Sequence, residues 1–115
     1  MARSVLLQLA RDSIQEVIEA TNTIDHASLL QEHPLLSQNI PTEVKIFIEE
    51  ELRGSYKINE ALSLLQNVII AAKKAAFEDK NFTPLTTSEY LRCSLEITLD
   101  TAEGIISQKD EPILS

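Results

Sequence analysis

The chain has 115 residues, of which 43% are hydrophobic and 24% charged, so it can bury one core without disulfides or metal. Its formal net charge of −8 repels phosphate backbones and anionic membrane surfaces, which argues against binding to nucleic acid or membranes. A single cysteine excludes an intramolecular disulfide, and no apolar run is long enough to cross a bilayer. We therefore expect one cytoplasmic domain over residues 1–115.

Apolar residues in segment 4–20 recur at three- and four-residue steps, which predicts an amphipathic helix. Polar residues, among them Arg11 and Glu16, are expected mostly on its solvent side. The pattern is lost over residues 21–42, where a short helical turn at about 26–31 is expected inside a connecting region.

The longest periodic segment, residues 59–77, predicts a central helix with a broad, alanine-rich apolar face. Asn59 is its expected N-cap, and small alanine side chains would let the helix lie close against a sheet. Pro84 then excludes helix continuation, and Thr87 or Ser88 can cap one further turn.

VKIFI, residues 44–48, is rich in β-forming residues and predicts a strand with one apolar face. Leu52 keeps the parity of that face. Between them, residues 49–51 predict either a hairpin or a bulge, followed by a second short strand that approaches Gly54.

RCSLEITL, residues 92–99, alternates strictly between apolar and polar side chains, which predicts a strand in an antiparallel sheet that is wet on one side. Cys93 has the apolar parity of this strand. Residues 100–115 are weakly patterned and are expected to fray in part.

ELRGSYK contains Gly54, one of only two glycines in the chain. Gly54 would let the backbone approach a ligand, while Arg53 bound a carboxylate or phosphate and Ser55 donated a hydrogen bond. The stretch matches neither a phosphate-binding loop nor a nucleophile elbow. Spacing alone favours the alternative, a residue with positive φ at a strand end or bulge.

The spacing of the cysteine, the histidines and the acidic residues predicts no catalytic or metal site. Cys93 is expected to be buried and inert, and His26 and His33 are too isolated to predict a metal site. Asp79 is expected to accept hydrogen bonds from amides of the following turn. Residues 49–51, three glutamates, are expected to form a solvated edge. We expect no metal, no cofactor and no catalytic residue.

The order of motifs in AAKKAAFEDKNFTPLTTSEYLRCSLEITL resembles the AMMECR-type domain family, named for the Alport, midface hypoplasia and elliptocytosis chromosomal region. LLQLARDSI is similar to the opening of that family, and ELRGS is similar to its Leu-Arg-Gly-Cys-Ile-Gly motif. Two departures stand out: Ser55 replaces the family's cysteine, and the chain is shorter than the family domain. The residues that carry the match are Leu52, Arg53, Gly54, Ala75, Ala76, Phe77, Asp79, Phe82, Pro84, Leu85, Glu89, Leu95, Glu96, Ile97 and Leu99.

The resemblance implies a cytoplasmic α+β fold and partners of the Memo-like or radical SAM type, but no established reaction. We therefore expect an α+β domain in which a small antiparallel sheet packs against two main helices, about 4–20 and 59–77. We expect a non-catalytic or degenerate domain that binds a partner or ligand. The alternative is an enzyme subunit with a small-molecule pocket near Arg53 and Asp79, working with those partners.

Arg53, Gly54, Ser55 and Asp79 are thus the candidate ligand-binding residues. A homodimer is expected if the shorter chain leaves apolar surface uncovered.

Overall fold

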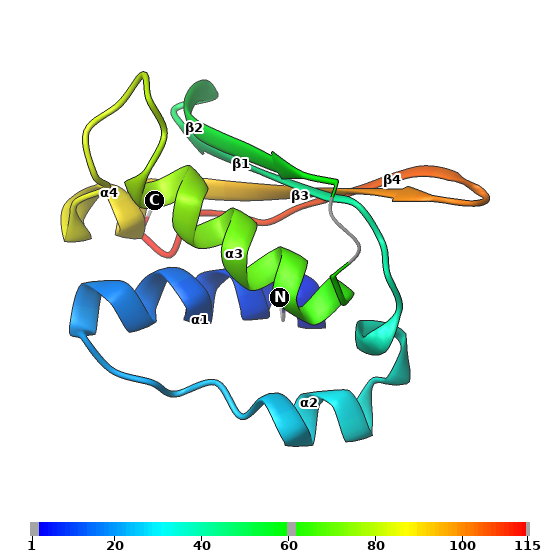
Figure 1. The fold of residues 1–115 in the computed structure, drawn as a ribbon. Helices are drawn as coiled ribbons and strands as arrows, with labels where there is room; N and C mark the ends of the chain where they lie inside the picture. The colour runs from blue at the N-terminus through cyan, green and yellow to red at the C-terminus, as the bar shows by residue number, and fades with distance from the viewer. Residues whose placement is uncertain (1–2, 60–61, 115) are drawn as a thin grey trace.

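A four-stranded antiparallel sheet lies over a layer of helices in the computed structural model, which describes residues 3–59 and 62–114 (Figure 1). The strand order is β2-β1-β3-β4. The fold is α+β, as predicted. The elements in chain order are α1 (Val5–Glu19), α2 (His26–Glu32), the 3-10 turn η1 (Pro34–Ser37), β1 (Thr42–Ile48), β2 (Glu51–Ile58), α3 (Leu64–Phe77), α4 (Thr87–Arg92), β3 (Ser94–Thr101) and β4 (Gly104–Lys109).

The core lies between one face of the sheet and the pair α1 and α3 (Figure 1). Helix α3 packs on β1 and β2, while α1 lies beside α3 and contacts β3. Burial of these apolar side chains is the main stabilising term. The fully buried apolar residues include Ala10, Ile14, Val44, Ile46, Leu64, Val68, Ala71, Ala72, Ala75 and Leu95.

Helix α1 confirms the predicted helix at 4–20, but two of its polar residues are buried, contrary to prediction. Arg11 is 1% exposed and Glu16 is 7% exposed. Glu16 accepts hydrogen bonds from the backbone N–H of Ile24 at 2.9 Å and from Lys73 at 3.2 Å. Burial opposes ionisation of Glu16, yet these hydrogen bonds prevail and lower its pKa. The side chains of Arg11 and Glu16 bind residues distant in the sequence, which a local pattern cannot reveal.

Helix α3 begins later than predicted. Its N-cap is Ser63, whose Oγ accepts from the Gln66 N–H at 3.2 Å while the Gln66 side chain reaches back to the Ser63 N–H. This reciprocal capping box satisfies two free N–H groups, whereas a single cap satisfies one. The prediction of Asn59 as N-cap is therefore wrong, and positions 60–61 of the predicted helix lie outside the described residues.

The β1–β2 connection contains both a tight hairpin and a bulge. Glu49 and Glu50, with φ of 52° and 68°, form its two-residue turn. Arg53 is the bulged residue, because the register passes from the Ile46–Gly54 pair to the Phe47–Leu52 pair without it. An extra residue reverses the parity of a strand. Leu52 is therefore 46% exposed, and its predicted place in the core is wrong.

The second half of the chain follows its apolar pattern up to β3. Cys93, Leu95, Ile97 and Leu99 are buried, as their alternation predicts. Residues 100–115 do not fray as expected, since β4 pairs with β3 from Gly104 onward. The cap of α4 is Thr86, in a capping box with Glu89, so the prediction of Thr87 or Ser88 is wrong.

Gly54 allows α3 to lie directly on β2. A Cβ at this position would stand 2.2 Å from the carbonyl oxygen of Ala75, a helix backbone atom. Gly54 does not have the positive φ that spacing favoured; among described glycines only Gly104 does. The glycine is needed for close packing of a helix on the strand.

Substituting Gly54→Ala should therefore push α3 away from the sheet. We expect the free energy of unfolding to fall by about 1–3 kcal/mol, the usual cost of overpacking, in urea titrations followed by circular dichroism. The neighbouring Ser55→Ala variant should stay within about 0.5 kcal/mol of the parent. Equal stability of both variants would show that α3 has no close contact with Gly54.

Candidate functional site

The Arg53 side chain leaves the bulge of β2 and binds the loop and helix that follow α3. Its Nε and Nη2 donate to the two carboxylate oxygens of Glu89 at 2.8 and 3.0 Å. Nη2 also donates to the carbonyl oxygen of Thr83 at 2.8 Å. The ring of Phe82 lies 5.3 Å from the guanidinium carbon. A bulge commonly redirects a side chain in this way.

Glu89 is held as a carboxylate by this arrangement. The hydrogen bond from Arg53 lowers the pKa of Glu89 to about 2, against opposition from burial and with help from the Thr86 N–H. Glu89 is therefore ionised at neutral pH and cannot serve there as a general acid. It joins the bulge of β2 to the start of α4.

Asp79 fastens the same loop to the edge of the sheet. Its Oδ1 accepts from the Asn81 N–H at 2.8 Å, which confirms the predicted hydrogen bonding within the following turn. Its Oδ2 accepts from the Ser55 N–H at 2.9 Å. Asp79 and Ser55 are thus in direct contact, and Arg53 is bound to Thr83 of the same loop, residues 78–86.

Ser55 has no activating partner in the part of the chain that the structure describes. No hydrogen bond joins its Oγ to a histidine, a lysine or a carboxylate there, and both histidines lie on α2 or at its end. A serine hydroxyl without a base is a weak nucleophile. Two cavities lie elsewhere, one of about 570 Å³ bounded by Arg3 and Ile113, and one of about 50 Å³ bounded by Pro41 and Ile105.

One atom of the Arg53 guanidinium, Nη1, is buried and has no hydrogen-bond partner among residues 3–59 and 62–114. The side chain as a whole is 11% exposed. A buried donor without an acceptor costs about 1–3 kcal/mol. Such a group is therefore a natural point of attachment for an acceptor from outside the chain.

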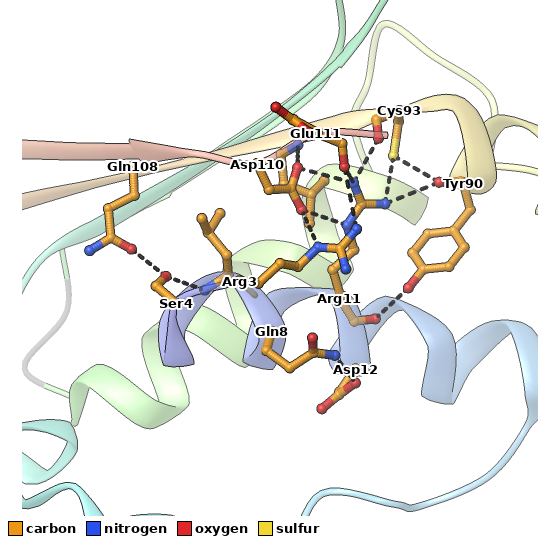
Figure 2. A network of polar contacts seen from close by, with 12 residues as sticks. Arg3, Ser4, Gln8, Arg11, Asp12, Tyr90, Cys93, Gln108, Asp110 and Glu111 are labelled. Carbon is orange, nitrogen blue, oxygen red and sulfur yellow. Dashed lines mark hydrogen bonds and ion pairs between the residues drawn. The ribbon is translucent and has the colours of Figure 1, made fainter. Parts of the chain in front are cut away.

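Arg11 provides the comparison, because each nitrogen of its guanidinium is hydrogen-bonded (Figure 2). Nε donates to Asp110 Oδ2 at 2.7 Å, and Nη2 donates to Asp110 Oδ1 at 3.0 Å and the Cys93 carbonyl at 2.7 Å. Nη1 donates to the Tyr90 carbonyl at 3.1 Å. Burial disfavours the charge, but Asp110 and its neighbours raise the pKa of Arg11. This arginine is saturated.

Cys93 belongs to the Arg11 cluster and is buried, as predicted. It is fully buried, and its Sγ lies 3.2 Å from the Tyr90 carbonyl oxygen. Burial raises the pKa of the thiol more than the nearby Arg11 lowers it. The thiolate required for attack is therefore disfavoured.

Glu89, Thr83 and Phe82 complete the Arg53 site but were not predicted as site residues. The spacing Thr86-x-x-Glu89 has the form of a capping box, so Glu89 could have been placed at a helix start from sequence. Its contact with Arg53 spans 36 residues, which local patterns cannot reveal.

The described residues contain no group of three or more His, Cys, Asp or Glu arranged to hold a metal ion. Nor, within the same ranges, is any helix sufficiently long and apolar to span a membrane.

These features define an α+β domain whose bulged strand presents a partly unpaired arginine. The family model AMMECR1 matches residues 7–111, and the chain belongs to this family. A Sulfolobus acidocaldarius protein is 35% identical over 111 residues, covering 91% of this chain and 47% of that protein.

The fold is also similar to the crystal structure of an uncharacterized protein from Pyrococcus horikoshii, with a TM-score of 0.72 and 23% identity. That match covers 82% of this chain and 48% of the other. The chain therefore spans about half the length of both proteins.

Replacing Arg53 should release Glu89. We expect the pKa of Glu89, about 2 in the parent, to rise toward about 4.3, the ordinary value for glutamate, in Arg53→Gln. Carbon-detected NMR titration of the Glu89 carboxyl measures it. Because the folded pKa lies below the ordinary value of about 4.3, the stabilisation from this ion pair is complete above that pH and is lost as pH falls toward 2.

Arg92→Gln, which removes an exposed arginine at the end of α4, should leave the Glu89 titration unchanged. A pKa that stayed near 2 in Arg53→Gln would show that Arg53 does not hold this carboxylate.

Proposed function

We propose that this domain is a non-catalytic recognition domain that binds an oxygen acceptor of a protein partner through Nη1 of Arg53. The observation that carries the proposal is the buried, unpartnered state of this atom, beside two guanidinium nitrogens that are fully engaged. Glu89 and Thr83 fix the plane of the guanidinium, so the free donor has a defined direction. A preorganised donor loses little entropy on binding.

The charge balance favours a neutral acceptor. Glu89 already neutralises Arg53, and Asp79 adds a further carboxylate to the loop 78–86. A carboxylate or phosphate ligand would bring another negative charge to a chain with net charge −8. A peptide carbonyl oxygen accepts the same hydrogen bond without that repulsion. We therefore assign a peptide carbonyl of a partner as the ligand group.

Phe82 lies beside the guanidinium that carries this donor. Its ring packs over the guanidinium and is itself 37% exposed. A partner segment that displaced this ring, or packed against it, would reach Nη1 and cover the exposed aromatic surface at the same time. The ligand is therefore expected to carry an apolar side chain next to the accepting carbonyl.

The alternative, an enzyme subunit, has less support. It requires a base at Ser55 or a cavity that holds both Arg53 and Asp79; the described residues place no base on Ser55, and the cavities of about 570 and 50 Å³ are bounded by other residues. The first partners to test are Memo-like and radical SAM proteins, which the resemblance implies. We propose that this binding takes place in the cytoplasm.

A peptide library displayed on phage tests the proposal across many partner sequences at once. Peptides selected on the parent protein should bind Arg53→Gln at least about tenfold more weakly, as expected for one hydrogen bond from a charged donor. Arg53→Lys should also bind weakly, because lysine lacks the planar fork. Affinities are measured by fluorescence anisotropy with synthetic peptides.

Arg92→Gln is the matched control and should bind as the parent does. Thermal melts establish that each variant is folded. Failure to select any peptide, or equal affinity of the peptides for parent and Arg53→Gln, would overturn the proposal.

A further inference from the structure

The two edges of the sheet are protected to different degrees. At the β2 edge, the bulge at Arg53 interrupts the strand, and Asp79 accepts the N–H of Ser55. Lys57 adds an exposed charge to the same strand. Bulges, charges and covering loops are the usual means of preventing a strand from pairing with another chain.

The β4 edge has no bulge in its register with β3, and its one charge, Lys109, stands at the very end of the strand. Within the described ranges no strand pairs with the side of β4 that faces away from β3. Ile105 is 74% exposed and Ile106 is 47% exposed, and consecutive strand residues lie on opposite faces. No charged residue occurs between Gly104 and Gln108. An uncharged, apolar and unpaired edge is a template for an added strand.

We propose that β4 pairs antiparallel with β4 of a second copy of this chain, which joins the two sheets into one. An edge strand can pair with its own copy about a two-fold axis, because the axis brings the same surface of each chain into the contact. The pairing would satisfy the outward backbone groups of β4 and cover Ile105 and Ile106 on the two faces.

The charges at the ends of β4 select this partner and this direction. Glu103 precedes the uncharged stretch and Lys109 ends it. Antiparallel pairing brings Glu103 near Lys109 of the partner subunit at both ends, whereas parallel pairing sets like charges together. Lys109 is exposed and lies 4.6 Å from the ring of Phe47, on the open face of the sheet. Pairing with Glu103 of the partner subunit therefore requires this ammonium group to leave the Phe47 ring of β1.

The interface is small, and each copy carries a net charge of −8. We therefore expect a weak dimer, with a dissociation constant in the micromolar range. It is independent of the proposed role of Arg53, which lies on the opposite edge strand.

Sedimentation equilibrium from about 10 μM to about 1 mM tests the proposal, since this range spans micromolar dissociation constants. The parent should move from a mass of 12.9 kDa toward twice that value. Ile106→Lys should weaken association at least about tenfold. Val17→Lys, on α1, is the matched control, since Val17 is 44% exposed, close to the 47% of Ile106. It should dimerise as the parent does.

A charge exchange tests the direction of the pairing. Lys109→Glu should weaken the dimer, and adding Glu103→Lys to it should restore association, because the opposite charges then meet again. A parent that stayed monomeric throughout this range, or a dimer unaffected by Ile106→Lys, would overturn the proposal. A double variant as weak as Lys109→Glu alone would rule out the antiparallel arrangement.

Discussion

The buried ion pair between Arg11 and Asp110 holds the two ends of the chain together and so fixes the frame of the fold. The Asp110 side chain is 3% exposed and accepts hydrogen bonds from Arg11, from Arg3 and from the Leu95 N–H at the start of β3. Arg11 in turn binds the carbonyl oxygens of Tyr90 and Cys93 at the junction of α4 and β3. Removing one partner of a buried pair typically costs about 3–5 kcal/mol. Helix α1, α4 and the end of β4 are therefore positioned as one unit.

Arg53 depends on this frame but differs from Arg11 in one respect. The position of α4 places Glu89 within reach of the bulge, and Gly54 brings α3, and with it the following loop, down onto β2. Both arginines are bound by a carboxylate through two hydrogen bonds. Arg11 has no nitrogen left over, while Arg53 retains Nη1. A saturated arginine stabilises the fold, whereas an arginine with a fixed, buried and unpaired donor can bind a partner once that donor is uncovered.

Periodicity is sufficient to predict the segments that bury one continuous face. The alanine-rich α3 and the alternation that ends at Leu99 are of this kind. Periodicity is insufficient where a partner lies far along the chain. It assigns Arg11 to solvent because the partner of Arg11 is 99 residues away, and it does not reveal β4 because both isoleucines of that strand are exposed. A one-residue bulge at Arg53, whose place periodicity does not fix, reverses the parity between Leu52 and Gly54 and leaves Leu52 outside the core.

The site can be predicted only in part. Resemblance singles out Arg53 and Asp79, and the fold binds Arg53 to the loop 78–86, which contains Asp79, but their recognition role stays a proposal. The most direct test is hydrogen exchange of the two guanidinium groups, measured by arginine side-chain NMR on the unbound protein. We expect both Nη groups of Arg11 to be protected, and Nη1 of Arg53 to exchange at least about tenfold faster than its Nη2, because a hydrogen bond worth about 1.5–3 kcal/mol is missing. Equal protection of Nη1 and Nη2 in Arg53 would mean that this arginine is as saturated as Arg11 and has no donor to offer a partner.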